Sequence, residues 1–151
     1  MYDIIKCSAE ASSFGFSNFF NFESVKNKIV IVENLEAAAN YKNKKVLIVL
    51  NDYAFDEGAI RIIAEKKQVC FLIDLGRLIR SHGISRAVAF SKIRNFLRLC
   101  VKYGAYYSFA SFADTPSKIR TSDELQNLIL LFDLNPGQAK FALKMVSHYL
   151  P

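Results

Sequence analysis

Five short runs of apolar, β-branched and aromatic residues recur along the chain and constrain its fold more than any other feature. They span Tyr2–Cys7, Lys28–Glu33, Lys45–Asn51, Val69–Leu75 and Ala105–Ala110. The runs are apolar on both faces and do not alternate with polar residues, which is typical of parallel strands covered by helices. They therefore predict an α/β fold with a mainly parallel sheet and outer helices.

Segments with helical periodicity lie between and after these runs. The predicted helices span Asn34–Tyr41, Phe55–Lys67, Ile84–Tyr103, Thr121–Phe132 and a last segment from Asn135 to about Tyr149. Thr121 and Glu124 form a T-x-x-E capping box, and Asn135 is an N-cap residue followed by proline. No Pro/Gly/Ser-rich linker divides the chain, and no apolar run approaches the ~20 residues that span a bilayer. We therefore expect residues 1–151 to form a single domain that does not contact a membrane.

The three cysteines, Cys7, Cys70 and Cys100, lie in apolar surroundings and show no C-x-x-C spacing. They are predicted to be small buried hydrophobic residues, and neither a disulfide framework nor a zinc site is expected. The N-terminus shows no secretory signal pattern. These features favour a cytoplasmic location, or a nuclear one if the source is eukaryotic.

The segment Ala11–Phe22 is unusual because five phenylalanines lie among serine, asparagine and glycine. Core packing of a short irregular helix is the main interpretation. Stacking on nucleic-acid bases and a protein-contact surface are the alternatives.

Positive charge is concentrated in the second half of the chain. Residues 1–75 carry nine Lys and Arg against ten Asp and Glu, whereas residues 76–151 carry eleven against four. Arginine dominates this excess, and its planar fork matches phosphate oxygens. The pattern favours a polyanionic partner, and nucleic acid in particular, over a positively charged face that only contacts solvent. The predicted RNA-binding residues are Arg77, Arg80, Arg86, Lys92, Arg94, Arg98, Lys102, Lys118 and Arg120.

The predicted helix Ile84–Tyr103 arranges part of this charge. The apolar face of this helix holds Ala89, Ile93, Phe96, Leu97 and Cys100. Arg94, Arg98 and Lys102 follow one another at four-residue spacing on another face. No acidic residue occurs within the helix. We therefore expect these charges to repel one another unless phosphates offset them.

Catalytic and metal-binding motifs are scarce. The chain has two histidines and lacks H-x-H, paired Cys/His and phosphate-loop motifs, so no cofactor, metal or catalytic residue is predicted. Glu33, Asp52 and Asp74 lie at or near the ends of predicted strands, where α/β barrels place their active sites. They allow an alternative function as a small metal-dependent phosphoesterase. His82 is expected to bind an anion or face water, and His148 to be structural.

The second half of the chain resembles one known family in the order of its motifs. The strand VCFLIDL precedes the basic turn GRLIRSHGISRA, the basic helix SKIRNFLRLCVKYG and the strand YYSFASFA. The helix start at Arg120–Leu125 and the closing segment NLILLFDLNPGQAKFALKM follow. Over about residues 55–145, this order resembles RNase P protein component 3, the barrel subunit of archaeal and eukaryotic RNase P, which is related to the PHP phosphoesterase fold. Ser122 stands where that family usually has proline, and the first half of the chain is compressed.

The resemblance implies a reduced or incomplete TIM barrel without the H-x-H of PHP enzymes. It also implies a non-catalytic protein subunit, since the RNA of RNase P removes the 5′ leader of precursor tRNA. Its expected partners are the RNase P RNA, precursor tRNA through that RNA, and the small RNase P protein component 2. The basic residues at matching positions would contact RNA phosphates.

Overall fold

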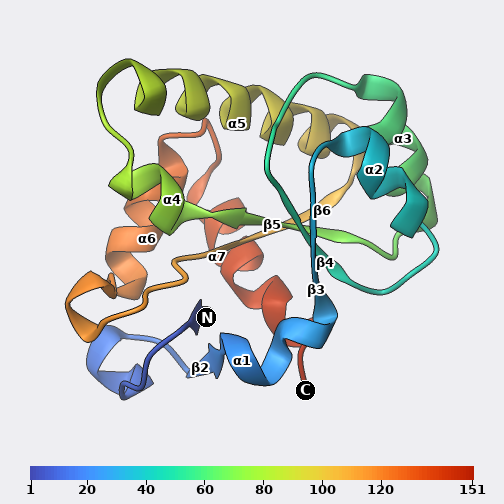
Figure 1. Cartoon of the computed structure of the whole chain (residues 1–151). Coiled ribbons are helices and arrows are strands. Elements are labelled where there is room, and N and C mark those ends of the chain that lie inside the picture. Colours follow the sequence, from blue (N-terminus) through green and yellow to red (C-terminus); the bar gives the residue numbers. More distant parts are fainter.

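The computed structural model describes all residues from 1 to 151 and contains two parallel sheets (Figure 1). Strands β3 (Ile29–Val32), β4 (Leu47–Leu50), β5 (Cys70–Asp74) and β6 (Tyr106–Ala110) form the larger sheet, in that order. Strands β1 (Tyr2–Ile5) and β2 (Asn18–Asn21) form a separate parallel pair. All five apolar runs thus contain a strand, which confirms the predicted α/β fold with a mainly parallel sheet.

The two sheets meet where β1 lies beside the residues that follow β6. The backbone N–H of Phe112 donates to the Ile4 carbonyl at 2.9 Å, and the N–H of Lys6 donates to the Ala113 carbonyl at 2.7 Å. No backbone ladder joins β2 to β3. The strand succession therefore curves but stays open between β2 and β3, which makes it a reduced TIM-barrel-like fold.

Helices and short turns cover both faces of the larger sheet. The α-helices are α1 (Phe22–Val25), α2 (Leu35–Ala38), α3 (Glu57–Lys66), α4 (Leu75–Arg80), α5 (Gly83–Tyr103), α6 (Ser122–Leu130) and α7 (Pro136–Met145). Short 3₁₀ turns span Ala11–Phe14, Lys26–Lys28, Ala39–Tyr41, Pro116–Lys118 and Val146–His148. None of the helices has both the length and the apolar composition that crossing a membrane requires.

Two apolar clusters explain why the strands are not amphipathic. Ile48, Phe71 and Phe109 lie on one sheet face in a cluster that also takes residues from α2, α3, α5 and α6. Leu47 and Leu72 lie on the other face, in a cluster with residues from the end of α7 onwards. Because residues outside the sheet bury most of both faces, the strands of the larger sheet are mainly apolar, although Ile31 on the edge strand β3 stays exposed.

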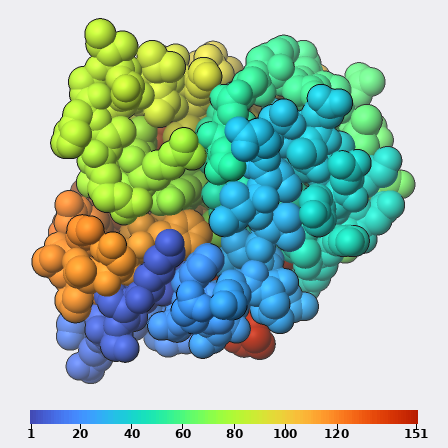
Figure 2. All heavy atoms as spheres, in the orientation of Figure 1, coloured from blue at the N-terminus to red at the C-terminus, as the bar shows by residue number.

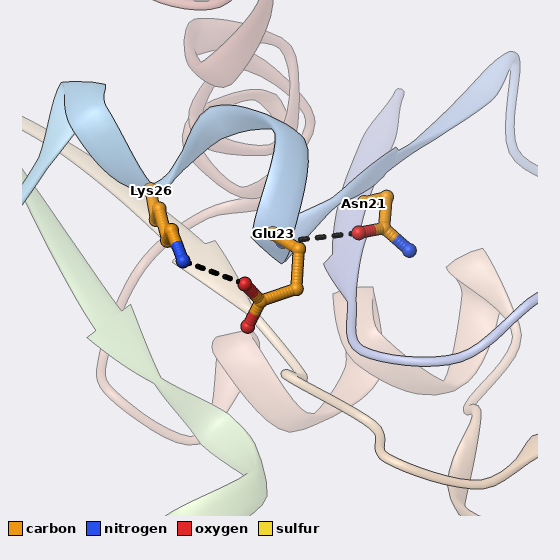
Figure 3. Close-up of polar contacts among 3 residues, drawn as sticks. All are labelled: Asn21, Glu23 and Lys26. Atoms are coloured by element: carbon orange, nitrogen blue, oxygen red, sulfur yellow. Dashed lines mark hydrogen bonds and ion pairs between the residues drawn. The ribbon is translucent and has the colours of Figure 1, made fainter.

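Helix starts follow local capping rules. Asn135 and Gln138 form a complete capping box at the start of α7, and the Thr121 hydroxyl accepts from the Glu124 N–H at 3.2 Å at the start of α6. At α1, Asn21 Oδ1 accepts from the Glu23 N–H at 3.0 Å, and Lys26 Nζ lies 2.8 Å from the Glu23 carboxylate (Figure 3). The predicted caps at residues 121 and 135 are therefore confirmed.

The phenylalanine-rich segment differs from its predicted conformation. In place of one irregular helix, it forms a 3₁₀ turn, the strand β2 and the start of α1. Pairing with β1 supplies backbone partners that local sequence does not reveal. The core-packing part of the interpretation is confirmed, because Phe16 is buried and the Phe16 and Phe19 rings lie 5.3 Å apart between centroids.

The cysteines follow their prediction in two cases out of three. Cys70 and Cys100 are buried, while Cys7 is partly exposed, and all three are free thiols.

Candidate nucleic-acid interface

Helix α5 is anchored by its second half. Ile93, Phe96, Leu97 and Cys100 are buried against the sheet, as the helical periodicity predicts. Residues 83–88, the first turns of the helix, are all exposed. The helix therefore extends beyond the core at its N-terminal end, along the upper edge of the molecule in Figure 1.

Helix α4 was not predicted and positions two of the basic residues. Strand β5 ends at Asp74, and α4 begins at the next residue. Asp74 Oδ1 accepts from the Arg77 N–H at 2.9 Å and so caps the start of the helix. Gly76 permits a close approach: a Cβ there would lie 2.0 Å from the Ser111 carbonyl oxygen. The segment that the sequence presents as a basic turn is thus a short helix, a two-residue break at Ser81–His82 and the start of α5.

The nine predicted RNA-binding residues are spread over three parts of the structure. Arg77 and Arg80 lie on α4, and Arg86, Lys92, Arg94, Arg98 and Lys102 lie on α5. Lys118 ends a 3₁₀ turn, and Arg120 precedes the α6 cap residue Thr121.

Six of these nine residues form ion pairs, which corrects the expected mutual repulsion along α5. Arg94 and Arg98 lie 4.0 Å and 3.7 Å from the carboxylate of Asp133, which belongs to the turn between α6 and α7. Lys102 Nζ lies 2.9 Å from Glu57 on α3. The other pairs are Lys92 with Asp52, Lys118 with Asp114, and Arg120 with Glu124. Acids distant in sequence thus offset the charge that the helix itself leaves unbalanced.

Arg94 and Lys102 are held by further contacts. The Arg94 guanidinium lies over the Phe90 ring, 5.9 Å from its centroid, while its buried Nε makes no hydrogen bond. The Glu57 carboxylate also accepts from the Tyr103 hydroxyl, and this bond together with Lys102 lowers the pKa of Glu57. The second half of α5 is therefore tied to α3 and to the α6–α7 turn.

Arg77, Arg80 and Arg86 form no ion pair in the structure. Arg86 donates to the Ile79 carbonyl at 2.6 Å, and Arg77 donates to the Asn51 carbonyl at 3.3 Å. All three side chains belong to exposed residues. They therefore keep donors and charge available for an anion.

Lys6 is a fourth cation in this region that the sequence did not single out. Its Nζ lies 4.9 Å from the centre of the Phe22 ring, and its charge, like those of Arg77 and Arg80, acts on Asp74. Its position just after β1, at the end where α/β folds gather functional groups, was the available signal. Lys6 was not predicted as a binding residue because residues 1–75 carry a slightly negative net charge. We use the name α4 cation group for Lys6, Arg77, Arg80 and Arg86.

The strand-end carboxylates do not form a common site. Glu33 accepts from the Asn51 side-chain amide at 3.1 Å, Asp52 pairs with Lys92 at 3.2 Å, and Asp74 caps α4. Burial raises the pKa of Asp74, although the Arg77 N–H and the nearby cations partly oppose the rise. No group of three potential metal ligands comes together in the structure. The arrangement gives no support to the phosphoesterase alternative.

Neither histidine belongs to a cluster of potential metal ligands. His82 is exposed and precedes α5 without a capping hydrogen bond from its side chain. His148 is exposed at the end of the last 3₁₀ turn.

One carboxylate that sequence reasoning overlooked is fully buried. Asp3 accepts from the N–H groups of Ile4 and Ser111, both at 2.8 Å, and from the Ser111 hydroxyl at 2.5 Å. Burial is the main cause that raises its pKa to about 6, against the opposing hydrogen bonds from Ser111 and Ile4. Asp3 thereby joins β1 to the residues after β6, close to the α4 cation group.

Together, these features define an α/β protein whose open, barrel-like parallel sheet carries unpaired cations on α4 and the start of α5. The chain is similar in structure to a chain of the "cryo-EM structure of archaeal Ribonuclease P with mature tRNA". The TM-score is 0.69 at 15% sequence identity, and the match covers 98% of this chain and 78% of that chain. This likeness shows a shared fold. No protein-family model and no curated protein matches the sequence.

Proposed function

We propose that this chain is a non-catalytic protein subunit of ribonuclease P that binds and stabilises the catalytic RNA during 5′ maturation of precursor tRNA. The observation that carries the proposal is the fold shared, over nearly the whole chain, with a chain of an archaeal RNase P complex. The motif order of the second half and the concentration of arginine there support it independently. The small RNase P protein component 2 is the proposed protein partner. The chain would act where precursor tRNA is processed, in the cytoplasm or in a eukaryotic nucleus.

The α4 cation group is the proposed centre of RNA contact. Its arginines are exposed and form no ion pair with a carboxylate. Phosphates bound there release counterions without first displacing an internal ion pair. The remaining predicted residues, Lys92 to Lys102 on α5 and then Lys118 and Arg120, would contribute at the edge of the same surface after exchanging their carboxylates for phosphates.

Reconstituted cleavage of precursor tRNA tests the function. RNase P RNA and the other protein subunits are assembled with and without this chain, and the rate of 5′-leader removal is measured at limiting RNA. We expect the chain to raise the rate. An unchanged rate and no binding to RNase P RNA would overturn the proposal.

Matched charge variants test the place of contact. Arg77→Gln with Arg86→Gln removes two unpaired charges while keeping a side-chain amide donor, and we expect RNA affinity to fall by about 1–3 kcal/mol. Arg94→Gln with Arg98→Gln removes two charges already paired with Asp133, so its loss should be smaller. Lys42→Gln with Lys44→Gln removes two charges outside the proposed site and is the control for binding through the overall positive charge of the protein. If all three variants lose equal affinity, no localised site exists.

A further inference from the structure

An open groove lies between α4, the start of α5 and the edge of the larger sheet. Its volume is about 590 Å³, and residues of β3, β4, α4 and α5 line it. In Figure 2, the yellow-green residues of α4 and the start of α5 lie directly beside the blue residues of β3 and the segments that follow. The groove is thus formed by segments from both halves of the chain.

Three aliphatic side chains on its walls are exposed to solvent. Ile31, on the edge strand β3, is 59% exposed, and Ile84 and Val88, one helical turn apart on α5, are 84% and 49% exposed. Leu50 and Ile93 continue the apolar lining toward the core. Exposed aliphatic side chains that line one groove together mark an interaction site more often than ones scattered singly over a surface.

The chemistry of the lining favours protein side chains over nucleic-acid bases. Unstacked bases are usually held by exposed aromatic rings or guanidinium planes. The one aromatic residue of the groove, Tyr53, instead packs edge-on against Phe96, with ring centroids 5.0 Å apart. The one guanidinium in the lining, that of Arg77, donates to the Asn51 carbonyl at 3.3 Å. Aliphatic walls formed by a helix and a sheet edge suit the apolar side chains of a second helix.

The rim of the groove is basic. Arg77 lines it and Arg86 lies between the groove residues Ser85 and Val88, and neither forms an ion pair. The two lining carboxylates are engaged, Asp52 with Lys92 and Asp74 with the start of α4. The free charge around the apolar floor is therefore positive, which selects a partner with acidic flanks.

We propose that this groove docks an amphipathic helix of a partner protein, with an apolar stripe facing Ile31, Ile84 and Val88 and acidic residues flanking that stripe. The inference shares Arg77 and Arg86 with the proposed RNA contact, so an acidic helix and RNA phosphates would compete for these two charges. A docked helix would account for the exposed apolar side chains in the first turns of α5, which contact with RNA phosphates would not.

A designed peptide tests the docking surface. The probe is a capped helical peptide of about 15 residues, long enough to be partly helical alone, with leucines at three- and four-residue spacing and glutamates beside them. Titration into the full-length protein, followed by amide NMR shifts and calorimetry, should show saturable binding centred on Ile31, Ile84 and Val88. The same peptide with lysine in place of glutamate should bind at least fivefold more weakly.

Surface variants make the test specific. Ile84→Ser with Val88→Ser should weaken peptide binding at least tenfold. Leu131→Ser with Phe141→Ser alters two residues of similar exposure, 58% and 57%, outside the groove and should leave binding unchanged. No saturable binding, or equal binding of both peptides, overturns the proposal. A loss of RNA affinity in the groove variant, with no effect on peptide binding, would assign the groove to RNA instead.

Discussion

Asp3 shows how one residue links the two sheets. Its carboxylate accepts three hydrogen bonds, two of them from Ser111, and Asp3 is entirely buried. These bonds hold β1 against the exit of β6, where the α4 cation group gathers. The same burial makes the charged form costly, since few groups other than those donors replace its lost hydration.

We predict that Asp3 makes the stability of the protein depend on pH. Its pKa is about 6 in the folded state against the ordinary value of 3.8, so the folded state binds more protons between these values. The free energy of unfolding should therefore fall as pH rises through this window, by about 3 kcal/mol from this group. The measurement is urea denaturation at intervals from pH 4 to pH 7.

Asp3→Asn removes the titrating group and keeps an oxygen acceptor for the two N–H donors. Its pH profile should be flatter than that of the wild type by the same amount. Asp123→Asn, which changes an exposed carboxylate on α6, serves as the control and should preserve the slope. Parallel profiles for the wild type and Asp3→Asn would show that Asp3 does not titrate in this window.

At the scale of elements, the placement of α4 depends on contact between two backbones. Gly76 is buried in the first turn of the helix, against the Ser111 carbonyl. This contact turns α4 across the end of β6 and points Arg77 and Arg80 away from the core. Glycine is therefore needed at position 76 because it is small, and not because of its backbone conformation, since its φ is not positive.

We expect Gly76→Ala to destabilise the protein by about 1–3 kcal/mol, because the added Cβ would lie 2.0 Å from the Ser111 oxygen and the backbone must shift. Gly58→Ala on α3 is the matched control, since its Cβ would approach only Asp56 Oδ1, at 3.7 Å. There, alanine should stabilise the protein by about 0.5–1 kcal/mol. Chemical denaturation measures both changes, and equal effects would refute the close-approach argument.

At the scale of the whole molecule, the net charge of +6 overstates the charge that is free to bind RNA. The fold brings Asp52, Glu57 and Asp133 to the basic helix α5 and pairs four of its cations. What remains is a smaller positive area around α4 and the first turns of α5. Affinity for a polyanion should follow this area more closely than the composition.

The salt dependence of RNA binding distinguishes contact by the α4 cation group alone from contact by all nine predicted residues. If the four residues of the α4 cation group make the phosphate contacts, the slope of log K against log salt should be about −3, at ~0.7–0.9 per contact. If all nine predicted residues contact phosphates, the slope should be about −6 to −8. Binding of RNase P RNA measured from low to physiological salt decides between them, and a slope near zero would exclude phosphate binding altogether.

The sequence by itself determined the elements whose signals are local. Apolar runs predicted the five strands that lie within them, because strands covered on both faces need not alternate in polarity. Asn135 followed by proline predicted a helix start, because an N-cap residue and a proline in the first turn act on backbone only a few positions away. The spacing of Ile93, Leu97 and Cys100 predicted the buried face of α5 for the same reason.

Only the tertiary structure decided which groups from distant segments meet. The pairing of β2 with β1, the ion pairs of Asp133 with Arg94 and Arg98, and the burial of Asp3 beside Ser111 all join residues far apart in the chain. Local sequence carries no record of such partners, because their positions follow from how helices and strands pack around a shared core. The candidate site is therefore smaller than the run of basic residues suggests, since the fold neutralises part of that charge with acids the run does not contain.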